Sequence, residues 1–276
     1  MSRFLIVNAD DCGFDTPTTD GVFDAHLNGI ISSTSVVVNF DGFSYAARRL
    51  QEVPSLKAGV HLNFYQGKPV LEPAKVPSLI NPLTGEFDPS IQKAGQISPS
   101  HLKSEFKAQI EKFLAAGLTP THLDNHRPEI YLDVPLFTAV IDLAAEYRLP
   151  IRMPFDNGFA SGDQKLTSMT GVPWEMVNTR GKQIREEIVK RGIACPDYFC
   201  YEFTTKGRTV ESLCEIIRTL PEGISEICTH PGYVGDRQIQ ELKVLQSKQV
   251  KEALTTNDIR LSSFEIVQKH AGGSCI

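Results

Sequence analysis

The feature that most constrains the fold is an alternation of short apolar runs with segments of helical periodicity. Eight runs have the length and composition of buried strands. They cover residues 4–7, 34–38, 57–62, 121–124, 150–153, 198–201, 225–229 and 259–261. Strands that alternate with helices form right-handed βαβ units, so the chain is predicted to build a parallel sheet.

Eight such rounds predict an α/β fold, specifically an irregular TIM-like (β/α) barrel in which residues 1–276 form a single catalytic domain. No linker composition and no sequence repeat divides the chain. Two connections, residues 64–98 and 154–196, are longer than a plain barrel requires. Both follow strands, so we expect these long loops on the C-terminal face, flanking the active site and selecting the substrate.

Charge and composition exclude several classes of protein. The 28 basic and 33 acidic residues give a net charge of −5, which argues against a general nucleic-acid binder. No run approaches the roughly 20 apolar residues of a membrane span, and the N-terminus does not resemble a signal peptide. The six cysteines form no CxxC pair, so reduced thiols in a cytoplasmic protein are expected.

Polar residues gather at the ends of the predicted strands. Five of the eight strands end in a charged residue or a histidine: Asp10–Asp11, His61, Asp124 with His126, Arg152 and His230. The carboxyl ends of parallel strands share one rim, and barrel active sites lie at that rim. Polar residues also end strands simply because loops begin there, but the recurrence of histidine favours a functional site.

His61 and His126 are candidate metal ligands. Together with one aspartate they would form a His₂-carboxylate set, which leaves coordination positions open for water and substrate. Either histidine alone is also compatible with an ordinary buried, hydrogen-bonded side chain. Neighbouring His122 and Asp124 could orient the ligands, although His122 starts its strand and is expected nearer the opposite end.

The remaining strand-end residues each allow a functional and a structural interpretation. Asp10 and Asp11 are either a turn or capping pair, or two carboxylates of which one binds a cation and the other acts as a base. Arg152 either orients a carboxylate or substrate anion, or forms a structural ion pair. His230 is either a general acid or part of a strand-ending turn.

Other residues carry weaker signals. His26, His101 and His270 fall on expected helices and are interpreted as structural or exposed. Trp174 and Tyr201 either stack on a sugar ring or pack in the core. The absence of Walker A, GxGxxG and GxSxG motifs counts against P-loop, dinucleotide and serine-hydrolase chemistry.

Three further classes of function stay open on the residues alone. A glycosidase would need two carboxylates, for which Asp10 with Glu202 or Asp124 are candidates. A metal phosphoesterase also uses Asp and His, but usually with ligands for two ions. A sugar-binding protein without catalysis would keep the aromatic contacts and tolerate loss of Asp10.

The ordered motifs resemble those of the YdjC-like carbohydrate deacetylases, which include the chitooligosaccharide deacetylases. Residues 5–13, LIVNADDCG, resemble the NADDFG signature of that family. The resemblance continues through residues 29–39, 59–62, 120–126, Arg152 and 229–233, and through the pattern Arg237…Glu241-Leu242…Leu245. It covers nearly the whole chain and is poorest in the two long loops.

The resemblance implies an irregular TIM-like barrel, one divalent ion (Mg²⁺ or Zn²⁺) and hydrolysis of the N-acetyl group of an amino sugar, in a disaccharide or its phosphate. Asp11, His61 and His126 match the metal ligands, Asp10 the base and His230 the acid. The expected partner is a small carbohydrate, with neither nucleic acid nor membrane, and a homodimer is left open. A glycosidase cleaving a disaccharide or phosphodisaccharide is the alternative.

Two departures from the family pattern stand out. Cys12 takes the place of the usual Phe. Residues 127–131, RPEIY, replace the His-rich run that follows the second metal histidine in relatives active on chitooligosaccharides. The second departure concerns the choice of sugar more than the metal, because His126 is kept.

Overall fold

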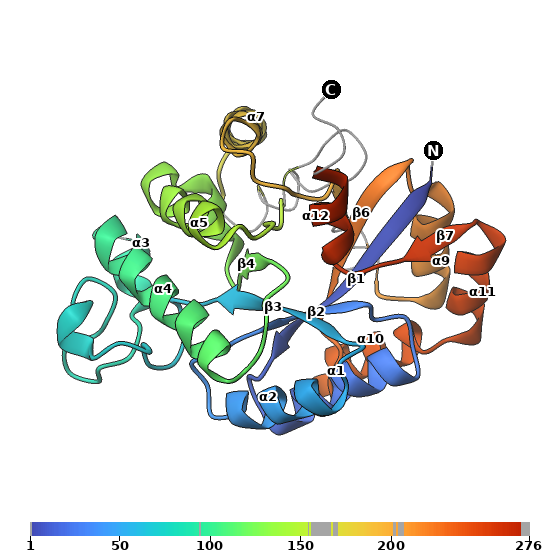
Figure 1. Ribbon diagram of the computed structural model, residues 1–276, viewed down its shortest axis with the longest axis horizontal. Coiled ribbons are helices and arrows are strands. Elements are labelled where there is room, and N and C mark those ends of the chain that lie inside the picture. The colour runs from blue at the N-terminus through green and yellow to red at the C-terminus, as the bar shows by residue number, and fades with distance from the viewer. Residues whose placement is uncertain are drawn as a thin grey trace.

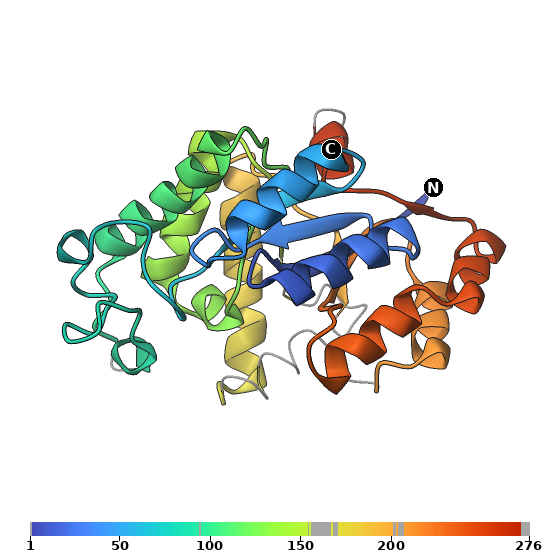
Figure 2. The ribbon, with the colours of Figure 1, turned by 90° about the horizontal axis from the view of Figure 1, so that it is seen from below.

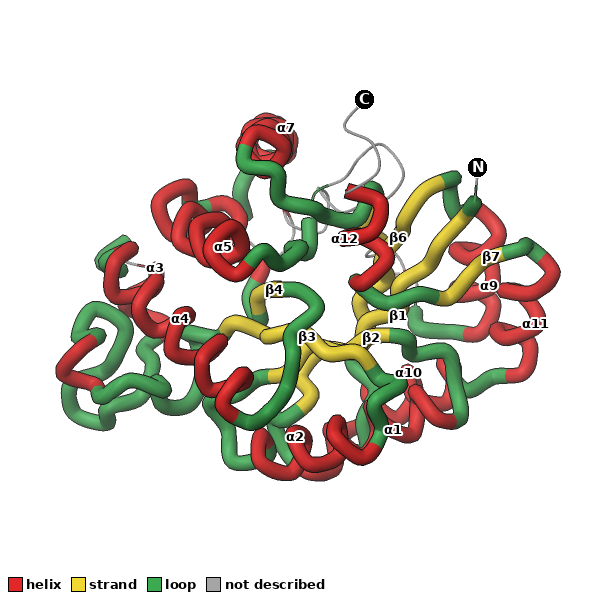
Figure 3. The backbone as a smooth tube through the Cα atoms, viewed as in Figure 1, coloured by secondary structure: helices red, strands yellow, loops and turns green. Residues whose placement is uncertain are grey.

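The structure is a computed structural model that describes residues 2–93, 95–153, 155, 167, 171–200, 203 and 207–271. The described residues form a seven-stranded sheet in which the named strands all pair in parallel. The sheet curls into part of a barrel, with helices around its outer side (Figures 1 and 3). The predicted fold class, an α/β barrel of irregular form, is confirmed.

Strand β1 is the centre of this sheet. The strands are β1 Arg3–Cys12, β2 Ser33–Val36, β3 Lys57–Leu62, β4 Leu123–Asn125, β5 Tyr198–Cys200, β6 Gly223–Thr229 and β7 Ile259–Leu261. Their order is β4-β3-β2-β1-β6-β5, and β7 pairs with the first residues of β1. Strand β1 pairs with β6 from Arg3 to Ala9 and with β2 from Asn8 to Cys12, so Asn8 and Ala9, just before the polar rim, are held by both neighbours.

The prediction of a strand over residues 150–153 is wrong. Within it, Ile151 makes a single parallel bridge, to Leu123 of β4. Pro150 has no amide hydrogen and another proline follows at position 154, so a regular ladder cannot extend through the segment. The amide of Arg152 still donates to the carbonyl of Leu123 at 3.1 Å, which fixes Arg152 at the rim.

Ten α-helices and two 3₁₀ helices are described. They are α1 Thr16–Leu27, α2 Phe43–Glu52, η1 Pro73–Lys75, α3 Pro89–Lys93, α4 Pro99–Ala115, η2 Pro128–Leu132, α5 Val134–Tyr147, α7 Trp174–Lys190, α9 Val210–Thr219, α10 Gly235–Leu245, α11 Lys248–Thr256 and α12 Glu265–Ala271. Side-chain caps begin several of them. Asp15 accepts from the amide of Thr18, and Asp133 from that of Leu136.

Neighbouring helices pack against one another around the sheet. Helix α1 contacts both α2 and α10, while α4 packs on α5. Seen from below, α1 and α2 lie side by side in front of the strands (Figure 2). No helix in the described part of the chain combines the length and apolarity that a membrane crossing requires.

The interior of the barrel changes from apolar to polar along β1. Leu5, Val7 and Ala9 belong to the large hydrophobic core, whereas Ile6 packs with Phe264 in a small separate cluster. The next residue on the face of Ile6 is Asn8, which is fully buried. Alternate residues of a strand share a face, so the polar part of the barrel interior begins at Asn8, directly after the apolar contact between Ile6 and Phe264.

One close approach ties a helix to the turn after β6. A Cβ atom on Gly21 of α1 would lie 2.3 Å from the Cα of Gly232. In an unconstrained helix, Gly→Ala stabilises by about 1 kcal/mol. Here we expect Gly21→Ala to lower the free energy of unfolding by about 1–3 kcal/mol, because backbone must move.

Urea unfolding measures this change. The matched control is Ser44→Ala on the exposed side of α2, which we expect to stay within about 0.5 kcal/mol of wild type. A Gly21→Ala protein as stable as wild type would contradict the close approach.

Candidate metal and catalytic site

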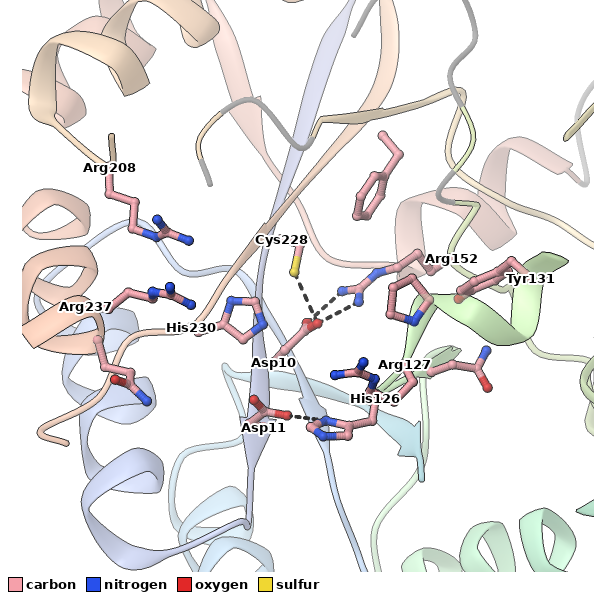
Figure 4. Close-up of a pocket in the computed structure, with 14 residues that line it drawn as sticks. Asp10, Asp11, His126, Arg127, Tyr131, Arg152, Arg208, Cys228, His230 and Arg237 are labelled. Carbon is pink, nitrogen blue, oxygen red and sulfur yellow. Dashed lines mark hydrogen bonds and ion pairs between the residues drawn. The ribbon is translucent and has the colours of Figure 1, made fainter. Parts of the chain in front are cut away.

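A bulge at the end of β1 turns two adjacent carboxylates toward the same space. Ala9 pairs with Thr34 but Cys12 pairs with Val36, so β1 has one more residue than β2 over this stretch. The extra residue is accommodated by Asp11, whose φ of 67° lies in the left-handed region that aspartate tolerates better than most residues. Asp10 and Asp11 therefore both face the cavity (Figure 4).

Asp11, His61 and His126 come together from three strand ends. The Oδ1 atom of Asp11 lies 2.8 Å from Nδ1 of His126 and 3.5 Å from Nε2 of His61. One ligand atom from each of the three lies within 4.8 Å of the others. The Nδ1 atom of His61 lies 2.8 Å from Asp124, an arrangement that orients a metal-binding histidine.

This part of the site attracts positive charge. Burial lowers the pKa of His61, but Asp124, Asp10 and Asp11 outweigh burial and raise it to about 9. Burial raises the pKa of Asp11, but its hydrogen bond with His126 and the nearby histidines bring it to about 2. Three carboxylates around one histidine therefore favour a cation, which is either a proton or a metal ion.

Asp10 is held by four donors. Two guanidinium nitrogens of Arg152 donate to its two oxygens, each at 2.7 Å. Asn8 donates to Oδ1 at 2.8 Å, and the thiol of Cys228 lies 3.2 Å from Oδ2. Burial raises the pKa of Asp10, but Arg152 and then His61 outweigh burial and hold the pKa well below its usual range. Asp10 is therefore ionised and fixed in orientation.

Arg152 also binds two further carboxylates. Its Nη1 lies 2.8 Å from Asp124, and its Nε donates to Glu226 at 2.7 Å. Burial raises the pKa of Glu226 to about 8, although Arg152 opposes the rise. The buried guanidinium of Arg152 thus contacts Asp10, Glu226 of β6 and Asp124, the carboxylate that is bound to His61.

These groups open into a cavity of about 370 Å³. Its walls include Asp10, Asp11, His126, Arg152 and His230, and also Tyr131, Phe199, Arg127, Arg208 and Arg237. His230 lies on the opposite side of Asp10 from His126 (Figure 4). A nitrogen of His230 lies within 4.8 Å of an Asp10 oxygen and of the Cys228 sulfur.

Most of the residues singled out in the sequence meet at this cavity. Asp10, Asp11, His126, Arg152 and His230 line it, and His61 is buried behind Asp11. Their individual roles stay predictions.

His122 lies deeper in the barrel, as expected. Its ring stacks on Phe264, with centroids 3.7 Å apart, and its Nε2 lies 3.0 Å from the hydroxyl of Ser35. Burial lowers the pKa of His122 to about 3, so it is a neutral, structural side chain. Ser35 in turn donates to Asp124 at 2.8 Å, which links His122 indirectly to the support of His61.

Two site residues escaped the sequence analysis although a signal was present. Glu226, Cys228 and His230 occupy alternate positions along β6 and its end, so a strand periodicity of two places them on one face. Of these three residues, only His230 was predicted as a site residue. Glu226 and Cys228 both contact the Asp10–Arg152 pair.

The remaining sequence predictions have mixed outcomes. Of the described residues in segment 64–98, none lines the cavity, but Tyr65 lies under the guanidinium of Arg127 at 4.3 Å. Much of segment 154–196 lies outside the described residues, and most of its described part is helix α7. Tyr201 and Glu202 also lie outside the residues that the structure describes. Trp174 is half exposed and does not line the cavity.

The three histidines assigned to helices have structural contacts. His26 lies 2.8 Å from the carbonyl of Ile31, and His101 lies 2.9 Å from the hydroxyl of Ser78. His270 is exposed and interacts with its own helix. None of the three approaches the cavity lining.

The sequence matches a known family over almost its whole length. The model of the YdjC-like protein family matches residues 4–256. The chain belongs to the YdjC-like family.

Curated relatives of the chain carry related names. A carbohydrate deacetylase from Brevibacillus brevis is 30% identical, covering 94% of this chain and 98% of the relative. A carbohydrate deacetylase from Thermoanaerobacter pseudethanolicus is 29% identical over 96% of this chain and 100% of the relative. A chitooligosaccharide deacetylase from Proteus mirabilis is 25% identical over 96% and 99%.

Solved structures share the fold. A protein of Enterococcus faecalis V583, named for a suspected cleavage of cellobiose phosphate, superposes with a TM-score of 0.79 at 25% identity, covering 96% of this chain and 99% of that one. A family 4 carbohydrate esterase from Streptomyces lividans gives a TM-score of 0.51 at 10% identity, covering 96% and 95%. The second likeness shows a common fold only.

The raised pKa of His61 makes a prediction for the metal-free protein. The pKa of His61 is about 9 in the folded state, against 6.5 in the unfolded chain. Protonated His61 therefore stabilises the folded state, and this contribution is fully present below pH 6.5. This contribution is lost as the pH rises through about 9. In EDTA, we expect the difference in unfolding free energy between wild type and His61→Asn to shrink by a few kcal/mol over that window.

Urea unfolding at pH 6, 7.5 and 9.5 measures the unfolding free energy of both proteins. Taking the difference between wild type and His61→Asn removes the contribution of groups that titrate alike in the two proteins. A difference that stays constant, or that grows with pH, would show that His61 does not hold a proton between the aspartates.

Proposed function

We propose that this protein is a metal-dependent carbohydrate deacetylase. It hydrolyses the N-acetyl group of an acetylated amino sugar, in a disaccharide or its phosphate. The observation that carries the proposal is the placement of Asp11, His61 and His126 beside the arginine-bound Asp10 at the floor of one cavity. The names of the curated relatives support the same reaction.

The residues present fit a divalent ion. Two imidazoles and one carboxylate are a usual ligand set for a catalytic ion with open positions. Asp124 behind His61 fixes the ring so that Nε2 faces Asp11. Bound there, a Mg²⁺ or Zn²⁺ ion supplies Lewis-acid chemistry, which makes water more acidic and an acetyl carbonyl more electrophilic.

Asp10 is the base in this proposal. Its low pKa makes it a weak base, so it would take a proton only from a water whose acidity an ion held by Asp11, His61 and His126 would raise. Of its four donors, the thiol of Cys228 is the weakest and the most distant. The Oδ2 atom can therefore exchange that contact for the attacking water, while Arg152 keeps the carboxylate ionised and oriented.

His230 is the acid on the other side of the cavity. Water adds to the acetyl carbon as Asp10 takes one of its protons. The C–N bond then breaks, and the nitrogen leaves with a proton from His230. The products are acetate and a free amino sugar. His230 suits this role because it faces Asp10 across the cavity, with a nitrogen within 4.8 Å of the carboxylate.

Three arginines on the walls support an anionic substrate. Arg127 pairs with Glu129 and Arg208 pairs with Glu241, whereas Arg237 is exposed and has no ion-pair partner among the described residues. Guanidinium groups bind phosphate oxygens in a forked geometry. We therefore include the phosphate of a disaccharide among the proposed substrates.

The glycosidase alternative has less support. It requires a second carboxylate free to act beside Asp10. Of the two candidates, Glu202 lies outside the described residues. Asp124 is fully buried and already bound by His61, Arg152 and Ser35, so it cannot flank a glycosidic bond. Release of a monosaccharide without acetate would favour the glycosidase.

We also propose a cytoplasmic location. The five described cysteines are all free thiols, which fits a reducing compartment.

Metal removal tests the function as a whole. Acetate release is measured from an N-acetylglucosamine disaccharide and from its phosphate. We expect exhaustive chelation to abolish acetate release and Mg²⁺ or Zn²⁺ to restore it, because the Lewis acid is lost and regained. Full activity after complete metal removal would rule out the proposed mechanism.

The variants Asp10→Asn and Asp11→Asn are expected to lose activity for different reasons. Asp11→Asn weakens metal binding, because a neutral amide replaces an anionic ligand, and excess metal partly rescues it. Asp10→Asn keeps the metal and loses the base, so kcat falls by about 10²–10⁴-fold and added metal does not help.

Metal content and acetate release on both variants decide the assignment, with Asp41→Asn, an exposed aspartate, as the control. If Asp10→Asn loses the metal while Asp11→Asn keeps it, the two roles are reversed. If neither variant loses tenfold in acetate release, the catalytic centre lies elsewhere.

A further inference from the structure

Glu241 is a buried carboxylate that the proposed mechanism does not use. It lies on α10, its side chain has no exposed surface, and each of its oxygens has one donor. The Oε2 atom accepts the backbone amide of His230 at 2.6 Å. The Oε1 atom accepts the Nε–H of Arg208, also at 2.6 Å.

The first contact fixes the strand end that carries the proposed acid. His230 directly follows β6, where the ladder of backbone hydrogen bonds stops, so its amide needs a partner from elsewhere. Glu241 supplies that partner as a charge-assisted bond. The position of the His230 ring relative to Asp10 thus depends on a residue that does not contact the cavity itself.

The second contact orients a cation of the cavity wall. Because Nε of Arg208 is bound to Glu241, the orientation of its guanidinium group in the cavity wall is restrained. Arg208 and His230 lie on the same side of the cavity, together with Arg237 (Figure 4). The neighbouring Gln240 of α10 donates to the carbonyls of Gly207 and Arg208 at 3.1 and 3.0 Å, so the same helix also holds the backbone of this loop.

We propose that Glu241 is a positioning residue that places the leaving-group acid His230 and the anion-binding Arg208 at a fixed separation. This inference rests on the proposed deacetylase function. The carboxylate has two oxygens and uses one for each partner, so it couples the protonation of the leaving nitrogen to the binding of an anionic group of the sugar. A purely structural ion pair would need the arginine alone and would not engage the amide of His230.

Glu241→Gln tests the coupling with little change in shape. Glutamine keeps one carbonyl acceptor but places its NH₂ group against the other donor, so one contact must break. Misplacement of a catalytic group by about 1 Å can cost roughly 10²-fold. We expect kcat to fall and KM to rise, with kcat/KM for the anionic sugar reduced by about 10- to 100-fold.

Arg208→Gln separates the two effects. It removes the cation but leaves the bond from His230 to Glu241, so we expect KM for the anionic sugar to rise while kcat changes less than about threefold. Adding Arg208→Gln to Glu241→Gln should raise KM less than the two single effects multiplied together, since both act through the same guanidinium. The control is Glu252→Gln on α11, an exposed member of a surface ion pair, which should match wild type.

An NMR measurement gives a result that does not depend on catalysis. The amide proton of His230 should resonate far downfield in wild type and in Arg208→Gln, and should move upfield in Glu241→Asp, in which the carboxylate is withdrawn by one methylene. Glu241→Asp keeps the buried charge beside Arg208 and replaces Glu241→Gln should that variant not fold.

The outcomes are distinct. A folded Glu241→Gln or Glu241→Asp with wild-type kcat, or with a change in KM alone, overturns the proposal. A loss of stability with unchanged kcat and KM also overturns it. If wild type releases no acetate from any sugar offered, the proposed function fails, while an unchanged His230 amide resonance in Glu241→Asp would separately overturn the geometric coupling.

Discussion

The buried guanidinium of Arg152 is the interaction on which the site depends. Only 4% of Arg152 is exposed, and it contacts Asp10, Asp124 and Glu226 at 2.7–2.8 Å. Several carboxylates without a cation could not be buried together, because each would take up a proton rather than remain charged. Arg152 keeps Asp10 and Asp124 ionised, as their lowered pKa values show, although burial alone raises both. At Glu226 the attraction of Arg152 does not outweigh the effect of burial, so the pKa of Glu226 stays raised.

The surplus of negative charge left by this arrangement makes the rim a candidate site for a cation. Arg152 offsets Asp10 and Asp124 in part, and Asp11 adds a further charge toward His61 and His126. A divalent ion held by Asp11, His61 and His126 would compensate that surplus, as would a proton on His61, whose pKa the surrounding carboxylates raise to about 9. The same charges that keep Asp10 ionised therefore also surround the proposed metal ligands with negative charge.

A large part of the fold could be predicted from the sequence, because its signals are local. Apolar runs and helical stripes located seven of the eight expected strands, and strand–helix alternation gave the parallel, barrel-like arrangement. The exception, residues 150–153, is also local in origin, since proline limits its hydrogen bonding. The grouping of Asp10, Asp11, His61 and His126 followed from a single topological rule, that the carboxyl ends of parallel strands share a rim. Arg152 reaches the same rim without a strand of its own, because its amide donates to Leu123 of β4.

The sequence by itself thus determined the fold class, the rim and most of the chemical groups on it. Only the tertiary structure decided how those groups are oriented. The bulge that turns Asp11 beside Asp10 depends on the register of β1 against β2. The forked contact of Arg152 with Asp10 joins residues 142 positions apart. The link from Glu241 to both His230 and Arg208 depends on where α10 packs. These are long-range distances fixed by packing, and no local pattern of residues encodes them.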